Sequence, residues 1–424
     1  MKEQVERGSG SAGPSESTRA ERLAADAARS AAPTAIEQAA FDLSLTDEQQ
    51  LVQRTARDWA RERVLPLAGE IDEKGAVPRE LVREMAELGF MGIDIPERWG
   101  GAGLGMVTYV LVMEEVNRAC ASTGVILGSH VSLACQPLLR SGTDRQRERF
   151  LVPLAKGQML GCFALSEPAS GSDAAAMQTS ARRDGDSWVL NGTKNFITNG
   201  AYADLTIVFA QTDPEKRHKG IAAFVVEKGT PGFSVGKLER KLGIRGSDTA
   251  QLHFTDARLA DDHRIGEVGD GFKIALATLD GGRIGIAAQA VGIARACLED
   301  SLAYAKERSA FGHPIADFQA IQQKLADMAT ETDAARLLTW RAAAMRDRGE
   351  KHVAEAAIAK LFASDVAVRA ARECVQIFGG YGYLRDFPAE RHYRDAKITE
   401  IYEGTSEIMH LVIADEMLGE VFGA

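Results

Sequence analysis

The sequence predicts a multidomain α+β protein in which a helical part, a β part and a second helical part follow one another along the chain. Three observations lead to this prediction. Apolar residues recur at helical spacing between about residues 46 and 156, short β-prone segments separated by turn residues follow from Gly161, and long stretches with few helix breakers fill the chain after Gly271. A chain of 424 residues is also too long for one ordinary core, so two or three packed units are expected.

The first forty residues are expected to stand outside these packed units. They are rich in Ala, Ser, Gly and Glu, and beyond Met1 only Val5, Leu23 and Ile36 are large and apolar. Such a segment buries too little surface to offset its ordering entropy, so we expect a disordered extension over 1–40. It lacks the apolar core of a secretory signal, and its several acidic residues argue against an organellar transit peptide.

The N-terminal helical domain is predicted over 41–160. Its first helix is expected to begin near Thr46, because Thr46 and Gln49 form a capping-box pattern ahead of an apolar repeat with helical spacing. Further helices are expected over 80–88, 106–119 and 144–156.

The middle domain, predicted over 161–272, is interpreted as a small antiparallel β unit. Its strands are expected over 187–190, 205–211, 221–227 and 251–254. The dipeptides Asp184-Gly185, Asn191-Gly192 and Asn199-Gly200 are the strongest hairpin or turn signals in the chain. No Gly-x-Gly-x-x-Gly motif follows a strand, so the sequence does not indicate a Rossmann dinucleotide domain.

The C-terminal domain is predicted over 273–424 as a helical bundle. Long stretches with few helix breakers favour helices over 274–308, 315–347 and 353–378.

Composition narrows the class of protein. Apolar residues make up 45% and charged residues 26%, the balance of a soluble globular protein, and the net charge of −10 argues against nucleic acid as a partner. No apolar run approaches the ~20 residues that a transmembrane helix needs. The five cysteines are scattered and the eight histidines show no ligand spacing, so we expect reduced thiols in the cytoplasm and no metal site.

Three short segments are candidates for chemistry. Ser166 to Asp173 crowds small and hydroxyl residues around glycine, which leaves backbone N–H groups free to contact an anion or a polar ring edge, although an ordinary loop has the same composition. Gln376 to Tyr383 holds three glycines in four positions, which lets another group approach the backbone closely. Ile401 to Ile408 places Glu403 between an aromatic residue and glycine, as either a buried base or a solvated acid near a helix start.

Together these segments resemble the acyl-CoA dehydrogenase family, over residues from about 43 to 424. Leu165 to Asp173 is similar to the family's Ser/Thr-Glu-Pro…Gly-Ser-Asp signature, and the run from Gln376 through Gly379 and Gly380 to Asp395 is similar to its longer signature. The resemblance implies an N-terminal helical domain, a middle antiparallel β domain and a C-terminal four-helix bundle. It also implies FAD between the β domain and the bundle of a homotetramer.

The resemblance assigns a set of residues to the binding of FAD. Arg308, an always-charged donor, would meet the flavin pyrophosphate across a subunit interface. The full set that the resemblance assigns to FAD is Phe163, Ala164, Leu165, Ser166, Gly171, Ser172, Phe196, Ile197, Thr198, Arg308, Phe311, Gln319, Gln376, Ile377, Phe378, Gly379, Gly380, Thr405, Ser406 and Glu407.

The resemblance further implies α,β-dehydrogenation of an acyl-CoA, with electrons passing on to electron-transferring flavoprotein. Glu403 would take the α proton while flavin N5 takes the β hydride. The residues it assigns to the substrate are Ser172, Asp280, Gly281, Gly282, Arg283, Gln289, Thr399, Tyr402 and Gly404. Some relatives carry the base on the bundle helix immediately before an arginine, but here that position is Gly282, so Glu403 is the candidate that remains.

The likeness is greatest to the short-chain, butyryl-type branch, in which the positions of Gln289 and Thr399 fill the end of the acyl pocket. Ala277 and Gly281 are smaller than the Gln and Met usual there, which leaves room for a wider or branched acyl group. An acyl chain on a carrier protein and a non-catalytic flavoprotein are the alternatives. Dibenzothiophene-type monooxygenases share the fold but lack the carboxylate, which argues against that activity.

Overall fold

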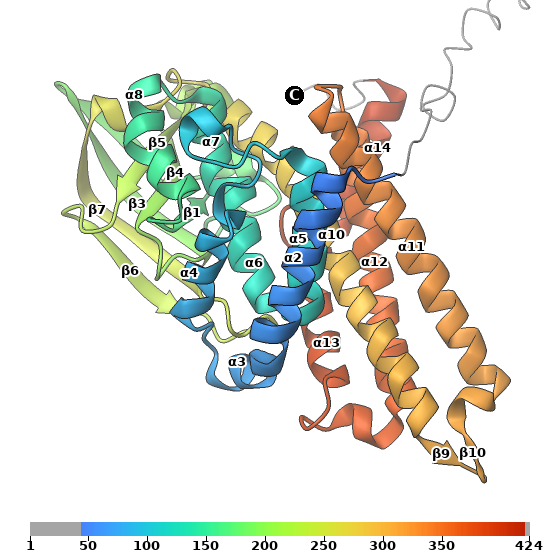
Figure 1. Cartoon of the computed structure of the whole chain (residues 1–424). Helices are drawn as coiled ribbons and strands as arrows, with labels where there is room; N and C mark the ends of the chain where they lie inside the picture. Colours follow the sequence, from blue (N-terminus) through green and yellow to red (C-terminus); the bar gives the residue numbers. More distant parts are fainter. Residues whose placement is uncertain (1–43, 420–424) are drawn as a thin grey trace, which may run out of the picture. The chain divides into compact units, whose positions relative to one another are not determined.

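The computed structural model describes residues 44–419, so the extension predicted over 1–40 lies outside the described residues. The part of the chain from Asp47 onward forms one unit, and its arrangement is shown in Figure 1. None of the helices described there is long and apolar enough to span a membrane.

The N-terminal helices surround a nearly fully buried pair. The α-helices are α2 (Asp47–Trp59), α3 (Ala68–Lys74), α4 (Arg79–Glu87), α5 (Gly105–Ala119), α6 (Ala121–Gly128), α7 (Gln136–Ser141), α8 (Asp144–Gln146) and α9 (Val152–Ala155). Helices α5 and α6 are apolar on nearly all sides, because they pack against each other, against α2 and against the long helix α10. The sequence analysis did not identify α6, whose composition of Ser, Thr, Gly and β-branched residues is poor for a helix.

The middle of the chain forms one eight-stranded sheet. The strands are β1 (Gly161–Ala164), β2 (Ser180–Asp184), β3 (Ser187–Thr198), β4 (Leu205–Gln211), β5 (Ile221–Glu227), β6 (Phe233–Leu238), β7 (Thr249–Ala260) and β8 (Arg264–Ile265). Their order is β6-β7-β3-β2-β4-β5-β8, and β1 pairs with β4. The expectation of an antiparallel sheet needs a correction: β1 runs parallel to β4 along four residues, and β2 also pairs with β4 in parallel at Ser180 and Gln211.

The Asn191-Gly192 signal does not mark a turn, contrary to prediction. Both residues lie inside β3, where the pairing with β7 shifts register between Leu190 and Gly192. A Cβ at Gly192 would lie 2.5 Å from Thr179 Oγ1, so glycine allows a β-bulge against a close neighbour. Asp184-Gly185 does form the β2–β3 turn, with Gly185 at a φ of +62°.

The C-terminal helices form a bundle around α10. They are α10 (Gly271–Glu307), α11 (Gln319–Asp347), α12 (Val353–Phe378), α13 (Ala389–Ala396) and α14 (Ser406–Leu418). The hairpin of β9 (Ser309–Ala310) and β10 (His313–Pro314) joins α10 to α11. Helix α10 packs on α12, α11 and α5, so it connects the bundle to the N-terminal helices.

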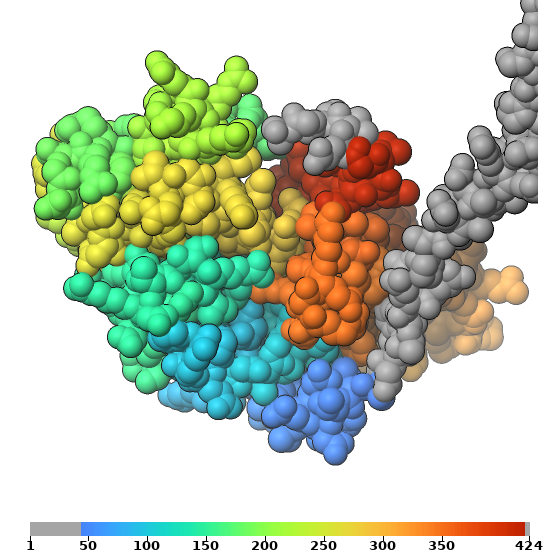
Figure 2. All heavy atoms as spheres, turned by 90° about the horizontal axis from the view of Figure 1, so that it is seen from above, coloured from blue at the N-terminus to red at the C-terminus, as the bar shows by residue number. Residues whose placement is uncertain are grey.

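The sheet and the bundle occupy different sides of the unit. Seen from above, the strands (green and yellow) gather at one side, and the later bundle helices (orange and red) at the other (Figure 2). One apolar core joins α5 and α6 to α10 and α12, while two others lie on the two faces of the sheet. The five cysteines, all within these buried layers, are free thiols.

Candidate active site

Glu403 lies on the short loop between α13 and α14. The 3-10 turn Lys397–Glu400 precedes it, and Thr405 caps α14 by accepting a hydrogen bond from the Ile408 N–H at 3.3 Å. The helix start foreseen at Thr405 is therefore real, but Glu403 stands just outside it. Glu403 adopts a φ of +53° and Gly404 a φ of +101°. A left-handed non-glycine residue stores strain that the surrounding structure must hold, and such residues cluster at functional sites.

The Glu403 carboxylate points inward from this loop. Its Oε2 atom is buried and has no hydrogen-bond partner among the described residues. Burial raises the pKa of Glu403 to about 7, against the opposing attraction of Lys360 and Arg283. A carboxyl group with this pKa can exchange a proton near neutral pH, which is what a general base needs.

Gly282 on α10 provides the space for this carboxylate. A Cβ at position 282 would lie 2.0 Å from Glu403 Oε2 and 2.9 Å from Leu133 Cδ2. No side chain can therefore occupy position 282 while Glu403 holds its present conformation. The geometry agrees with the prediction that the base stands on the loop and not on α10.

Gly285 and Gln289 follow Gly282 on the same face of α10. A Cβ at Gly285 would lie 2.8 Å from the Tyr109 hydroxyl, which is buried and unpaired within residues 44–419. One turn further, Gln289 accepts a hydrogen bond from the Tyr402 hydroxyl. Residues 282, 285 and 289 share one face of a helix with 3.6 residues per turn, and we call this face the strip of α10. Glu403, Tyr109 and Tyr402 all contact this strip. The sequence analysis did not single out Tyr109, because its α5 segment has the pattern of an ordinary core helix.

The other residues assigned to the substrate differ in their surroundings. Arg283 is buried and its Nη1 donates to Asp280 Oδ1 at 2.7 Å, while its Nε has no partner in the described chain. Thr399 is buried, and its hydroxyl donates to the Ala396 carbonyl at 2.7 Å. Ser172 is exposed on the loop that follows β1.

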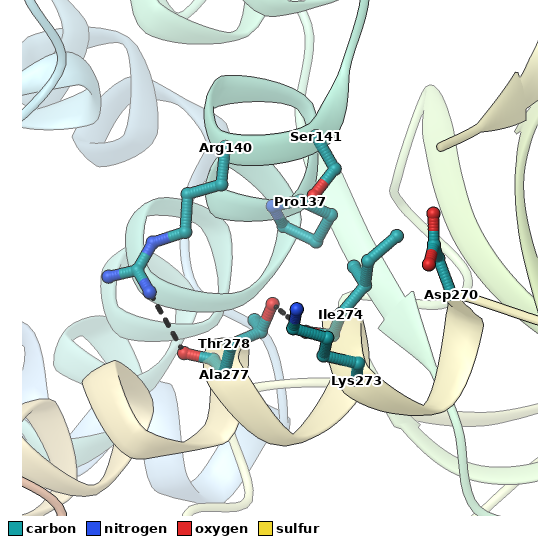
Figure 3. Close-up of a pocket in the computed structure, with 8 residues that line it drawn as sticks. All are labelled: Pro137, Arg140, Ser141, Asp270, Lys273, Ile274, Ala277 and Thr278. Atoms are coloured by element: carbon teal, nitrogen blue, oxygen red, sulfur yellow. Dashed lines mark hydrogen bonds between the residues drawn. The ribbon is translucent and has the colours of Figure 1, made fainter. Parts of the chain in front are cut away.

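The small residues Ala277 and Gly281 face away from Glu403. A Cβ at Gly281 would lie 2.1 Å from Arg346 Nη1, so the guanidinium fills the space beside this glycine. Ala277 lines a surface pocket between α7 and the start of α10, where its carbonyl accepts a hydrogen bond from Arg140 (Figure 3). The effect of these two positions on the width of the acyl group stays a prediction.

A buried ion pair shapes the loop from Leu165 to Asp173. Lys194 on β3 donates to the Leu165 carbonyl at 2.9 Å and to Glu167 Oε1 at 2.8 Å. Burial lowers the pKa of Lys194 to about 8, opposed by Glu167. Burial alone would raise the pKa of Glu167, but Lys194 and backbone N–H donors hold it below its ordinary value. Glu167, the glutamate of the signature, therefore stabilises the conformation of this loop.

The first group of predicted flavin residues forms one surface of the sheet domain. Phe163 and Ala164 lie in β1, and the loop after them approaches the end of β3, where Asn195 N–H donates to the Ser166 carbonyl at 2.9 Å. Phe196 has a φ of +60° and is 63% exposed, which is unusual for an aromatic side chain. A Cβ at Gly171 would meet nothing within 4 Å, so the backbone there is open to a large partner.

Most of the second group lies at the far end of the bundle, whereas Thr405, Ser406 and Glu407 lie at the start of α14. Arg308 stands over the Tyr381 ring at 5.5 Å, and Phe311 in the β9–β10 hairpin is 94% exposed. A Cβ at Gly379 or Gly380 would meet nothing within 4 Å. Figure 1 shows this hairpin at the end of the bundle remote from the sheet, so a single chain does not bring the two groups together.

The exposed members of both groups fit an elongated flavin, while the buried members are part of the apolar cores: Phe163, Ala164, Leu165, Ile197, Ile377 and Phe378. An exposed aromatic side chain, open glycine backbone and an exposed guanidinium are what a planar ring system with a pyrophosphate would cover. In the described part of the chain, no group of three or more His, Cys, Asp or Glu side chains could hold a metal ion.

Comparisons with known proteins agree with this geometry. Three family models match the chain: "Acyl-CoA dehydrogenase, N-terminal domain" over residues 46–158, "middle domain" over 162–257 and "C-terminal domain" over 269–418. The short-chain specific acyl-CoA dehydrogenase of Bos taurus is 52% identical over 376 residues, covering 89% of this chain and 91% of the relative.

Solved structures give the same result. Butyryl-CoA dehydrogenase from Megasphaera elsdenii is 47% identical with a TM-score of 0.88, covering 89% of this chain and all of that chain. A chain in the structure of the electron transferring flavoprotein of Acidaminococcus fermentans is 46% identical with a TM-score of 0.89 and the same coverage.

Proposed function

Because the chain belongs to the acyl-CoA dehydrogenase family, we propose that it oxidises a short-chain acyl-CoA to the trans-2-enoyl-CoA with Glu403 as the base. The observation that carries this proposal is the Glu403 carboxylate, buried beside Gly282 with a pKa of about 7. The relatives named above as short-chain and butyryl-CoA dehydrogenases support the short acyl chain.

Glu403 performs the proton transfer in this reaction. A hydrogen α to a thioester carbonyl is weakly acidic, so it needs a base that is anionic at neutral pH and unoccupied by other donors. Within the described structure Glu403 Oε2 has no other donor, and a pKa of about 7 leaves a substantial fraction of Glu403 anionic at neutral pH. Gly282 and Gly285 bring α10 close to Glu403 Oε2 and to the Tyr109 hydroxyl, so the reacting α carbon would lie beside these two side chains.

FAD is the cofactor of this family and supplies the hydride acceptor when bound. On this chain, Phe163 to Ser172 and Phe196 to Thr198 would hold its ring. Arg308, Gln319, Gln376 to Gly380 and Thr405 to Glu407 would hold the remainder. Since these groups lie apart in one chain, a neighbouring subunit would supply the second, as in a homotetramer. Electron-transferring flavoprotein as acceptor and a reducing, cytoplasmic compartment complete the proposal.

A panel of acyl-CoA thioesters tests the proposed function. We expect butyryl-CoA, or a branched near-relative, to exceed octanoyl-CoA in kcat/KM, measured with a dye acceptor and by bleaching of the bound flavin. Gln289 is fully buried and tied to Tyr402 at the end of the strip, and each methylene is worth about 1–3 kcal/mol of discrimination. Gln289→Ala is therefore expected to shift the preference toward longer chains.

The same panel contains the outcomes that contradict the proposal. A wild-type optimum at eight carbons or beyond would refute the short-chain assignment. Faster bleaching by a carrier-protein thioester than by the matching CoA thioester would favour the carrier as substrate. A protein that binds flavin and is bleached by no thioester would be a non-catalytic flavoprotein.

Arg308 links cofactor binding to assembly. Arg308 is exposed and directly precedes β9, whose hairpin lies at the bundle end remote from the sheet. We therefore expect Arg308→Ala to weaken FAD retention and to loosen the oligomer. Flavin absorbance after gel filtration and mass by light scattering measure the two effects. Arg182→Ala, which removes an exposed arginine from β2, is the control. Full flavin occupancy in a monomer would overturn the shared-site arrangement.

A further inference from the structure

Lys360 is a buried lysine directly beneath the Glu403 loop. It lies in the middle of α12, in the apolar run from Ala356 to Ala363, and is fully shielded from solvent. Its Nζ donates a hydrogen bond to the Gly404 carbonyl oxygen at 2.6 Å. The proposed chemistry so far gives this residue no role.

A fully buried ammonium needs a reason, because desolvation disfavours its charge. Burial lowers the pKa of Lys360 to about 8, and the largest opposing influence is the negative charge of Glu403. The hydrogen bond of its ammonium goes to a backbone carbonyl rather than to a carboxylate. The ammonium of Lys360 therefore lies against the backbone of the residue that follows Glu403, where its charge and its hydrogen bond both act on the loop.

The loop has a second, uncharged anchor on the same helix. Ser364, one turn after Lys360, donates to the Thr399 carbonyl at 2.8 Å and to the Lys360 carbonyl. These contacts hold the chain on both sides of Glu403, whose φ of +53° requires such support. The two anchors differ in charge, which makes their effects separable.

Other charges act on the same carboxylate. Arg283 on α10 attracts it, although Arg283 is already paired with Asp280. The hydroxyls of Tyr109 on α5 and Tyr402 on the loop are neutral, because burial raises both pKa values far above their ordinary range. Glu400 and Glu407 act on Lys360, and Glu400 is paired with Lys397. Of these groups, Lys360 is the largest attraction on Glu403.

We propose that Lys360 is a positioning residue of the reaction, whose ammonium holds the Gly404 backbone and favours the anionic form of the Glu403 carboxylate. The inference rests on the proposed function of Glu403. Burial pushes Glu403 toward its protonated form, in which it cannot accept a proton, and the adjacent positive charge limits this effect. The pKa of about 7 is then a balance between burial and Lys360.

The test is a titration of Glu403 in the flavin-loaded enzyme without substrate. Infrared difference spectra between the enzyme and its Glu403→Gln variant isolate the carbonyl band of the protonated Glu403 carboxyl group. In the wild type, the band should disappear with a midpoint near pH 7. In Lys360→Met, which removes charge and donor, and Lys360→Gln, which keeps a donor without charge, the midpoint should rise by about one pH unit.

Ser364→Ala is the matched control, because it weakens the neutral anchor and leaves the charge in place. Its midpoint should stay near that of the wild type. A wild-type midpoint in Lys360→Gln, or an equal rise in Ser364→Ala, would overturn the proposal and assign Lys360 a purely structural role. The pH profile of flavin bleaching by butyryl-CoA should shift in the same direction as the infrared midpoint.

The two readouts separate this inference from the proposed function. If no thioester bleaches the wild-type flavin, the proposed function fails, while the infrared midpoints still decide whether Lys360 controls Glu403. If bleaching is normal and the midpoints do not move, only the role of Lys360 fails.

Discussion

Glu403→Gln should bind flavin and acyl-CoA almost normally and fail to reduce the flavin. The substitution keeps the size of the side chain and the backbone N–H, while the proton acceptor is lost. Removal of a general base costs about 10²–10⁴-fold, and the loss should lie at the upper end because the other acids nearby cannot replace it. Glu400 is paired with Lys397, and Glu407 is exposed at the start of α14. Anaerobic stopped-flow bleaching of the flavin measures the effect.

Glu400→Gln is the matched control for this variant. It removes a carboxylate three residues away, whose ion pair lies outside the strip along Gly282 and Gly285. It should bleach at nearly the wild-type rate. If Glu403→Gln bleaches within tenfold of the wild type while Glu400→Gln does not, the base has been assigned to the wrong residue.

Gly282→Ala should inactivate the enzyme although the base, Glu403, is itself unchanged. The added Cβ would lie 2.0 Å from Glu403 Oε2, so the carboxylate must leave its position. Displacement of a reacting group by about 1 Å can cost on the order of 10²-fold in rate, and we expect a loss of at least that size in flavin bleaching. The midpoint of Glu403 titration should change as well, because the carboxylate moves relative to Lys360.

Gly69→Ala is the control for the glycine substitution. Gly69 lies in helix α3, and a Cβ there would make only an ordinary contact, 3.7 Å from Arg391 Nη1. Alanine is favoured over glycine within helices, so this variant should be as stable as the wild type or slightly more so. Near-normal bleaching in Gly282→Ala would mean that Glu403 reacts from a different conformation.

The sequence predicts the bounds of those helices and strands whose local pattern agrees with their place in the fold. The strands β4 and β5 and the helix α12 begin and end where the sequence places them, because apolar β-branched runs or a breaker-free helical stretch meet clear turn residues. Helix α6 and the bulge at Gly192 were not foreseen. Both depend on neighbours in space, α5 in one case and Thr179 in the other, which local patterns do not contain.

In the candidate site, too, some residues are identified by local motifs and others only by their neighbours in space. Motif resemblance identified Glu403 and Gly282, but the 2.0 Å relation between them is visible only in three dimensions. Lys360 and Tyr109 were missed, since a lysine in an alanine-rich helix and a tyrosine in a core helix have ordinary structural explanations. A charged residue in the middle of an apolar helical run was the one local signal for Lys360.

The glycine strip of α10 has a consequence for how the protein folds. Gly281 and the two strip residues Gly282 and Gly285 lie within five residues in the first half of α10, the longest of the described helices. Each glycine costs about 0.8–1.0 kcal/mol of helix propensity relative to alanine. This segment is therefore a poor helix on its own and gains its helical form from contacts with α5 and α12. We expect α10 to complete its central turns only as those helices dock, so that the acyl pocket is assembled in a late folding step.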